Sequence, residues 1–250
     1  SATATAGVAF AQQPVVRIED QFGNLVTTDN STVVTAARSA GSGILQGTLT
    51  KTAVNGLATF TGLNHQVATT ITIVFSKSGL TSVTSGNIVV SPAAANQLVF
   101  KTQPGSATAG SVFGTQPVVA TQDAFGNDSN VGLASSLDVT ATLTAGTGSL
   151  QGTATLNIGT SSGNGTITFT NLRLDAAGTD KQLTASASGL ASGVSSVFTV
   201  SAGALTKLQL LVPGESAAPG TASGKTGTPS AQVTGTAFDV TVNAVDAFWN

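Results

Sequence analysis

Short apolar runs that alternate with polar residues cover most of the chain, and Gly, Asn, Asp or Ser-Pro interrupts them. An alternation of period two turns one face of a segment toward a core and the other toward water, which is typical of a β-strand. No segment shows a helical period over ten or more residues. The pattern predicts strands at residues 14–19, 32–37, 44–50, 57–61, 70–76 and 87–90, and then at residues 97–102, 116–122, 137–144, 150–156, 165–170, 182–186 and 196–200.

The second group of strands lies within about a hundred residues and has seven members. Seven short strands in a stretch of that length favour an immunoglobulin-like β-sandwich. The predicted fold class is therefore all-β, built from tandem immunoglobulin-like sandwich domains that short linkers join.

One five-residue string occurs three times. Asp20–Asn24 returns as Asp123–Asn127 and, with Trp249 in place of glycine, as Asp246–Asn250. Other segments match as well, and the offset grows from 103 residues (Ala6 to Ala109) to 110 residues (Ser78 to Ser188). Growth of this kind indicates small loop insertions, whose entropic cost is low. The chain is thus a tandem repeat with a unit of about a hundred residues.

The repeat predicts three domains, at residues 1–92, 96–201 and 205–250. The first lacks its opening strand, because residues 1–6 align with the segment after Pro104. The second is complete, and the third holds only the N-terminal part of a unit. Linkers of about four residues predict units that are stacked end to end and semi-rigid.

Three motifs follow one another in the same order in both longer repeats. They are Val15–Asn24, Gly43–Leu45 and Asn55–Phe60 in the first, and Val118–Asn127, Gly148–Leu150 and Asn164–Phe169 in the second. This order resembles the bacterial immunoglobulin-like repeats of the invasin and intimin type. The family often places Pro soon after the Asp-x-x-Gly-Asn turn, where this chain has Leu25-Val26 and Asp128-Ser129. The resemblance implies a cell-surface or secreted stalk, adhesin or structural array in a bacterium or archaeon.

The recurring string has the chemistry of a tight turn. Glycine supplies a positive φ, Asp and Asn hydrogen-bond nearby backbone, and Phe22 and Phe125 are predicted to be buried, where their rings plug one end of the sandwich. Trp249 in the glycine position either changes the turn type or caps an interface. The residues of this structural turn motif are Asp20, Phe22, Gly23, Asn24, Asp123, Phe125, Gly126, Asn127, Asp246, Phe248 and Asn250.

The same turns raise a second hypothesis, a calcium site. Calcium takes about 6–8 oxygen ligands, and the candidates are Asp20, Asn24, Asp123 and Asn127. The turn interpretation predicts no cofactor, and a melting curve that excess chelator leaves unchanged.

Composition removes several classes of function. Only 8% of residues are charged, and the net charge is −2, so there is no electrostatic signature for nucleic acid or an anionic membrane. No apolar run approaches the length of about 20 residues that a membrane-spanning helix needs. The chain has no Cys and therefore no disulfide framework. Its surface is either rich in hydroxyl groups, as in a secreted β-protein, or covered by other copies or by glycans.

Catalytic constellations are missing from the sequence. The single His65 is predicted to be a polar surface residue in a turn, and Asp138, Asp175 and Asp180 occur in one repeat only. No nucleophile–base pair or acid pair can be assembled from them, so the chain is not expected to be an enzyme. Asn-x-Ser/Thr triplets make Asn30, Asn127 and Asn164 candidates for glycosylation.

These observations favour a secreted or cell-surface structural protein whose repeats form a stalk, fibre, sheath or surface layer. The alternative is an adhesin spacer that presents a receptor- or glycan-binding tip lying outside these 250 residues. With one Trp and no Tyr, the chain lacks the aromatic platform that sugar binding needs, so glycans or a host surface would be contacted by regions outside it. Low charge and a scarcity of Lys and Pro, which protect strand edges, predict self-association into a homo-oligomeric or fibrous assembly.

Overall fold

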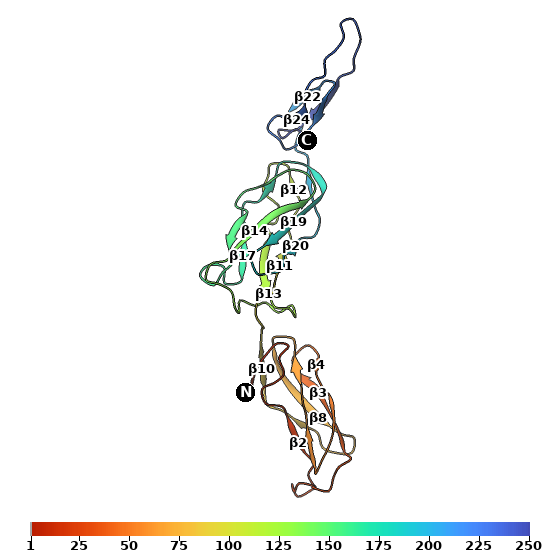
Figure 1. Cartoon of the computed structure of the whole chain (residues 1–250), viewed down its shortest axis with the longest axis vertical. Helices are drawn as coiled ribbons and strands as arrows, with labels where there is room; N and C mark the ends of the chain where they lie inside the picture. Colours follow the sequence, from red (N-terminus) through yellow and green to blue (C-terminus); the bar gives the residue numbers. More distant parts are fainter. Residues whose placement is uncertain (1) are drawn as a thin grey trace. The chain divides into compact units, whose positions relative to one another are not determined.

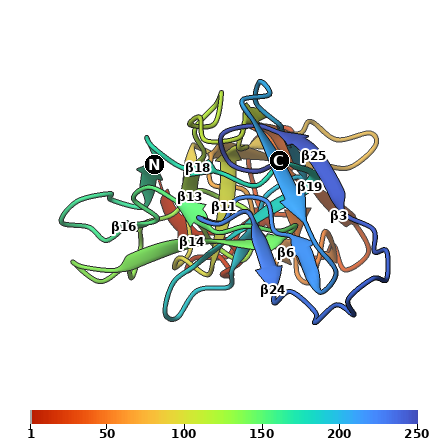
Figure 2. The ribbon, with the colours of Figure 1, turned by 90° about the horizontal axis from the view of Figure 1, so that it is seen from above.

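The computed structural model describes residues 2–250, and within that range the chain forms strands and loops without a helix (Figure 1). The turned view in Figure 2 shows the same composition of strands and loops. The predicted all-β fold is confirmed. No helix long and apolar enough to cross a membrane occurs in the described residues.

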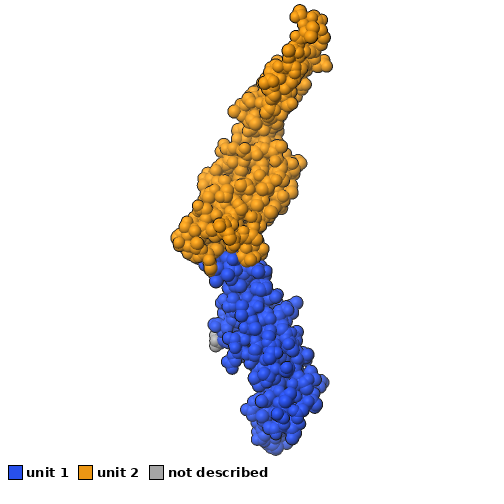
Figure 3. Space-filling view, in the orientation of Figure 1, with its two compact units in different colours: residues 1–95, 122–131 blue, residues 96–121, 132–250 orange. Residues whose placement is uncertain are grey.

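The chain divides into two compact units that exchange a short segment (Figure 3). Unit 1 holds the chain up to Ala95 and also Gln122–Val131, whereas unit 2 holds Asn96–Thr121 and Gly132–Asn250. The second copy of the repeated turn therefore belongs to unit 1, together with the body of the first repeat. The predicted domain boundaries, which run straight through the sequence, did not include this exchange.

Unit 1 contains one large sheet and two short strand pairs. The large sheet has the order β1 (Ala2–Thr5), β10 (Ile88–Ser91), β8 (Thr70–Ser76), β3 (Val33–Ala40) and β5 (Thr50–Thr52), and β9 (Val83–Thr84) pairs with β8. The short pairs are β2 (Val15–Arg17) with β6 (Leu57–Thr59), and β4 (Leu45–Gln46) with β7 (Asn64–His65). Buried side chains from the large sheet and from both pairs form one core, so unit 1 is sandwich-like.

Unit 2 repeats this topology and adds a strand. Its large sheet has the order β12 (Ala107–Thr108), β21 (Phe198–Ser201), β19 (Gly178–Ser186), β14 (Asp138–Ala145) and β16 (Thr155–Asn157), and β20 (Gly193–Val194) pairs with β19. A three-stranded sheet follows the order β11 (Gln97–Thr102), β13 (Val118–Gln122) and β17 (Thr166–Thr168), and β15 (Leu150–Gln151) pairs with β18 (Arg173–Leu174). Among these strands, only β11 has no counterpart in the described residues of unit 1.

The partial third repeat, which also belongs to unit 2, forms two further pairs. They are β22 (Lys207–Leu211) with β25 (Thr241–Val245), and β23 (Glu215–Ala217) with β24 (Lys225–Gly227). Leu208 and Leu210 on β22 are 72% and 52% exposed, and within residues 2–250 β22 pairs with β25 alone.

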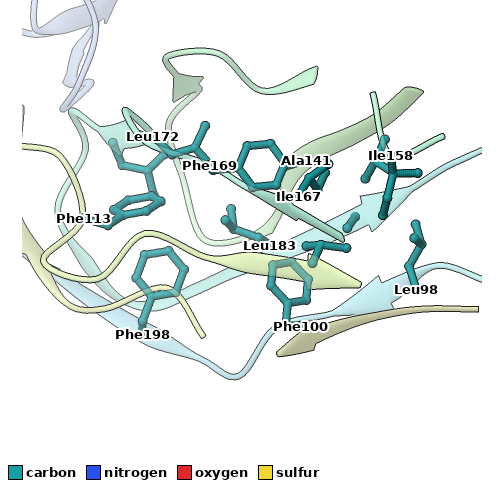
Figure 4. Close-up of a cluster of buried hydrophobic side chains, with 14 of the residues drawn as sticks. Leu98, Phe100, Phe113, Ala141, Ile158, Ile167, Phe169, Leu172, Leu183 and Phe198 are labelled. Carbon is teal, nitrogen blue, oxygen red and sulfur yellow. The ribbon is translucent and has the colours of Figure 1, made fainter. Parts of the chain in front are cut away.

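The core of unit 2 shows why these residues fold as they do (Figure 4). Alternate residues of β19 and β14 point inward and meet Leu98 and Phe100 from β11 and Phe169 from the loop after β17. The rings of Phe113 and Phe198 meet edge to face with centroids 5.0 Å apart. Unit 1 has a comparable aromatic pair, Phe60 and Phe75, at 5.1 Å.

Two expected strands are each broken by a glycine. Residues 44–50 and 150–156 were predicted as single strands, but Gly47 and Gly152 have φ values of 102° and 99°, and each divides its segment in two. A Cβ at either position would overlap the backbone of Gly62 or Asn171 on the neighbouring segment. By contrast, β8 and β11 have the predicted bounds.

We predict that residues 96–201 fold when they are expressed alone, because every residue of the buried cluster of unit 2 lies between Leu98 and Val200. Thermal unfolding followed by circular dichroism should give one sharp transition. As a control, Phe169→Ala, which removes a fully buried ring, should lower stability by about 3–5 kcal/mol. A fragment that lacks a β-type spectrum would contradict this prediction.

Candidate functional site

The repeated turn closes in the same way in all three copies. The first residue, Asp20, Asp123 or Asp246, donates its backbone N–H to the carbonyl of the Asn four residues on, over 2.9–3.1 Å. Its Oδ1 accepts the backbone N–H groups of the Phe and of the Asn, over 2.8–3.0 Å. The carboxylate thus fixes the backbone of the turn through bonds that lie within the turn itself.

The asparagine at the end of the turn hydrogen-bonds to the backbone of a second segment of the chain. In unit 1 the Asn127 side chain accepts the Ala68 N–H at 2.8 Å and donates to the Gln66 carbonyl at 2.8 Å. In unit 2 the Asn250 side chain accepts the Ala177 N–H at 2.6 Å and donates to the Asp175 carbonyl at 2.9 Å. These paired bonds to backbone are the same in both units.

The phenylalanine of the turn rests on a glycine that no other residue could replace without displacing the ring. Phe125 lies against Gly7, and Phe248 lies against Gly110, so that a Cβ on either glycine would overlap the ring. Both glycines have positive φ, 74° and 81°, which disfavours other residues independently. We call each glycine with its neighbouring backbone, Gln66–Ala68 or Asp175–Ala177, an acceptor end.

The prediction that Phe22 and Phe125 are buried plugs is wrong. Phe22 is 79% exposed and Phe125 is 41% exposed. Neither ring belongs to a hydrophobic core, and Phe125 is covered in part because it meets the acceptor end around Gly7. The phenylalanine is therefore a contact residue, and Phe22 is the copy whose contact is unfilled among residues 2–250.

Trp249 keeps the turn and adds a contact. Its φ is 70°, close to the 82° of Gly23 and the 85° of Gly126, and the hydrogen bonds of Asp246 are unchanged. The indole ring packs against Gly224, and the Lys207 ammonium lies 3.6 Å from the ring centroid. Trp249 therefore leaves the turn type unchanged, and its ring covers the surface around Gly224.

The aspartate is stabilised as a carboxylate in every copy. Hydrogen bonds, led by the Asn24 side chain, lower the pKa of exposed Asp20. Burial alone would raise the pKa of Asp123, but N–H groups of Asn127, Ala93 and Phe125 outweigh burial and lower it. The pKa of Asp246 is lowered in the same way, against burial, by bonds from Asn250, Gly203 and Phe248.

Beside each acceptor end a buried polar side chain binds the carbonyl of a Gly-Ser/Thr-Gly loop, Gly41–Gly43 or Gly146–Gly148, and this corrects the prediction for His65. His65 is fully buried, and its Nε2 lies 2.8 Å from the Ser42 carbonyl. In unit 2 the matching carbonyl, that of Thr147, accepts a bond from Lys181 Nζ at 2.7 Å. Burial lowers the pKa of Lys181, and the nearby charge of Asp180 partly opposes this.

The two units therefore place the buried polar side chain that binds the loop carbonyl on different strands. By the strand pairing, His65 takes the place of Leu174, and Lys181 takes the place of Ile71. In each unit one position is polar and reaches the loop carbonyl while the other is apolar. Sequence alignment of single positions cannot reveal this exchange, although His65 is the one histidine of the sequence and was a signal.

The calcium candidates are occupied by hydrogen-bond donors in this geometry. Asp20, Asn24, Asp123 and Asn127 do come together as two Asp–Asn pairs, but in each pair the Asn Nδ2 group faces the Asp Oδ2, over 3.1 Å and 2.8 Å. No group of three or more His, Cys, Asp or Glu that could hold a metal is found in residues 2–250. The chelation test remains a prediction.

The three Asn-x-Ser/Thr sites differ in their surroundings. Asn30 and Asn164 are not among the buried residues. Asn127 Nδ2 already donates to Gln66 and to Asp123, over 2.8 Å each, so a glycan on this nitrogen would remove the contact with the acceptor end.

No family model matches the chain, and no curated protein matches it. Among solved structures, a Bacteroides vulgatus β-glycosidase matches at 15% identity with a TM-score of 0.35 and covers 68% of this chain and 21% of its own. The Yersinia pseudotuberculosis adhesin InvE matches at 17% sequence identity with a TM-score of 0.30, and the match covers 79% of this chain and 56% of InvE. Domains 4–9 of the surface layer protein SbsC match at 17% sequence identity with a TM-score of 0.28, and the match covers 92% of this chain and 30% of the SbsC chain.

These likenesses are distant, and this chain spans only about a fifth of the glycosidase it matches. They include bacterial adhesin and surface-layer domains as well as an enzyme, and none carries an argument about function. The resemblance to invasin- and intimin-type repeats therefore rests on the sequence motifs.

The contact between the Phe125 ring and Gly7 predicts that alanine costs more stability at Gly7 than at Gly23, although the two glycines have similar φ values. Gly7→Ala and Gly23→Ala should each cost about 1–2 kcal/mol because of positive φ. Gly7→Ala should cost about 1–3 kcal/mol more, since it displaces the Phe125 ring, whereas a Cβ on Gly23 meets nothing within 4 Å. Urea unfolding of both variants measures the difference.

The extra cost should vanish in a Phe125→Ala background, because the ring is then absent. Equal losses for Gly7→Ala and Gly23→Ala in the otherwise unchanged chain would show that Phe125 does not depend on Gly7.

The lowered pKa of Asp123 predicts that acid weakens unit 1. A carboxyl whose pKa is lower in the folded state stabilises it above the unfolded value of about 3.9, and this stabilisation is lost as pH falls through the folded pKa. The chain should therefore lose stability below about pH 4, and Asp123→Asn should lose less over that interval. Asp29, whose pKa is lowered to about 2 by bonds from Thr32 and Ser31, contributes in the same direction in both proteins. Identical pH profiles would contradict the role assigned to Asp123.

Proposed function

We propose that the chain is part of a secreted or cell-surface structural protein in which successive repeats are mechanically coupled by the Asp-x-Phe-Gly-Asn turn. The observation that carries this proposal is the recurrence of one contact. In each unit a phenylalanine rests on a glycine and an asparagine bonds to two backbone groups. No catalytic step is part of the proposed function.

The path of the chain supports coupling. Residues up to 95 belong to unit 1, residues 96–121 to unit 2, residues 122–131 to unit 1 and the remainder to unit 2. Residues just before this first change of unit bind the segment 122–131. Asp123 Oδ2 accepts the Ala93 N–H at 2.9 Å, and the Ala95 N–H donates to the Val131 carbonyl at 2.9 Å. These bonds tie the linker to the segment that holds the second copy of the turn.

Self-association is the finer part of the proposal, and the surface supports it. Large apolar side chains such as Ile44 (74% exposed) and Val54 (61% exposed) stand on a surface with few charges. Few charges leave little repulsion between copies. We propose that such surfaces join copies into a stalk, fibre, sheath or surface layer, and the adhesin spacer is the alternative that a monomeric chain would favour. Sedimentation over a concentration series separates the two.

Single-molecule stretching of the full chain tests coupling. The variant Phe125→Ala/Asn127→Ala should lose the first force peak, because it removes both parts of the contact. Phe22→Ala/Asn24→Ala changes the same residue types in the exposed copy of the turn and should leave the peaks unchanged. Equal traces for the two variants and the parent chain would refute a mechanical role for the turn.

A further inference from the structure

Unit 1 has an open groove beside strand β2. Its volume is about 730 Å³, and it is lined by residues 14–21, by Val34 and Phe75, and by residues 76–77 and 79–85. Val15 and Val83 in its walls are 54% and 53% exposed. On this side β2 has no strand partner within residues 2–250, because it pairs only with β6.

In unit 2 strand β11 fills the corresponding place. Strand β13, the counterpart of β2, pairs with β17 on one side and with β11 on the other. The Leu98 N–H donates to the Ala191 carbonyl at 2.8 Å, and the Ala191 N–H donates to Asn96 at 2.9 Å. Leu98 and Phe100 are then 2% and 9% exposed. The groove of unit 1 thus lies where unit 2 holds strand β11.

The turn of the first repeat lies at the end of this groove. Glu19, Asp20 and Gln21 line it. In the other two copies, Oδ2 of the turn aspartate also accepts an N–H of the linker, from Ala93 at 2.9 Å or from Gly203 at 2.7 Å. Within residues 2–250, Asp20 Oδ2 accepts only the Asn24 side chain. A linker and the strand after it would therefore meet one continuous surface.

We propose that this groove, with the adjoining Asp20 carboxylate, binds the linker and opening strand of a repeat of the same type. The ligand is an extended, unpaired β-segment with apolar side chains at alternate positions, which adds a strand to β2. Strand β22 of a second copy is a poor ligand, because β25 already pairs with it along its whole length.

The groove also selects the size of the incoming side chains. By the strand pairing, Phe75 stands where unit 2 has Ala185, and Val83 stands where it has Gly193. A Cβ at Gly193 would lie 2.5 Å from the Leu98 carbonyl oxygen. The segment that fits unit 1 therefore lies farther from β9 than β11 lies from β20, and it prefers a smaller residue in the place of Phe100.

The test attaches residues 92–103 before residue 1 of the full chain, which continues the repeat in register at the offset of 103. The chain has no Cys, so Val15→Cys gives a single thiol in the groove. Val8→Cys is the matched control, because Val8 is 56% exposed and lies outside the groove. Two further attached segments carry Phe100→Ala, or Leu98→Asn with Phe100→Asn. Circular dichroism verifies that each protein is folded.

We expect thiol labelling at position 15 to slow about tenfold or more, equivalent to about 1.4 kcal/mol of strand binding, with the unchanged segment and with the segment that carries Phe100→Ala. Labelling should be unchanged with the segment that carries both Asn substitutions, and at position 8. Equal labelling at position 15 in all proteins would overturn the proposal. Protection of position 15 that instead grows with the concentration of the unextended chain would overturn it in favour of a second copy. Neither result depends on the force measurement, so the proposed function can fail separately.

Discussion

The contact of a phenylalanine ring with a glycine at positive φ is the constraint on which the organisation of this chain depends. The glycine must lack a Cβ for two separate reasons, its backbone conformation and the ring above it, at both Gly7 and Gly110. The ring comes from the next repeat along the sequence. Each glycine is therefore covered by a ring that lies more than a hundred positions along the sequence, at Phe125 or Phe248. The turn of one repeat thus completes the contact surface of the repeat before it.

Local sequence patterns predicted much of the fold, and the reasons for the failures are physical. Period-two alternation located β8 and β11, because one face of each strand is buried. The same pattern missed the breaks at Gly47 and Gly152, since these arise from close approach of another segment. Turn chemistry correctly joined Asp20 to Asn24, but it could not say against what Phe22 or Phe125 would pack. A ring is costly to expose, yet the sequence of one turn does not name its partner.

The polar support of the acceptor ends was also outside the reach of position-by-position reasoning. His65 and Lys181 lie on different strands, but each supplies the only buried donor that meets its loop carbonyl in the described structure. Within residues 2–250 His65 Nδ1 has no hydrogen-bond partner, and Lys181 loses hydration. Both units thus accept an unfavourable burial at the same point. The common element is the Gly-Ser/Thr-Gly loop beside the acceptor end, Gly41–Gly43 in unit 1 and Gly146–Gly148 in unit 2, rather than the type of the buried residue.

The comparison between the exposed and the docked turns explains how a small contact can be effective. Asp20 makes the same bonds within its turn as Asp123 does, although Phe22 touches no acceptor end within residues 2–250. The turn is therefore already ordered before it binds, and docking has to immobilise little more than one ring and one amide. One ring and two hydrogen bonds would still bind weakly between separate molecules. Between repeats of one chain, a short linker keeps the effective concentration high, so the same contact is suited to joining neighbours in a tandem array and is too small to recruit a free partner.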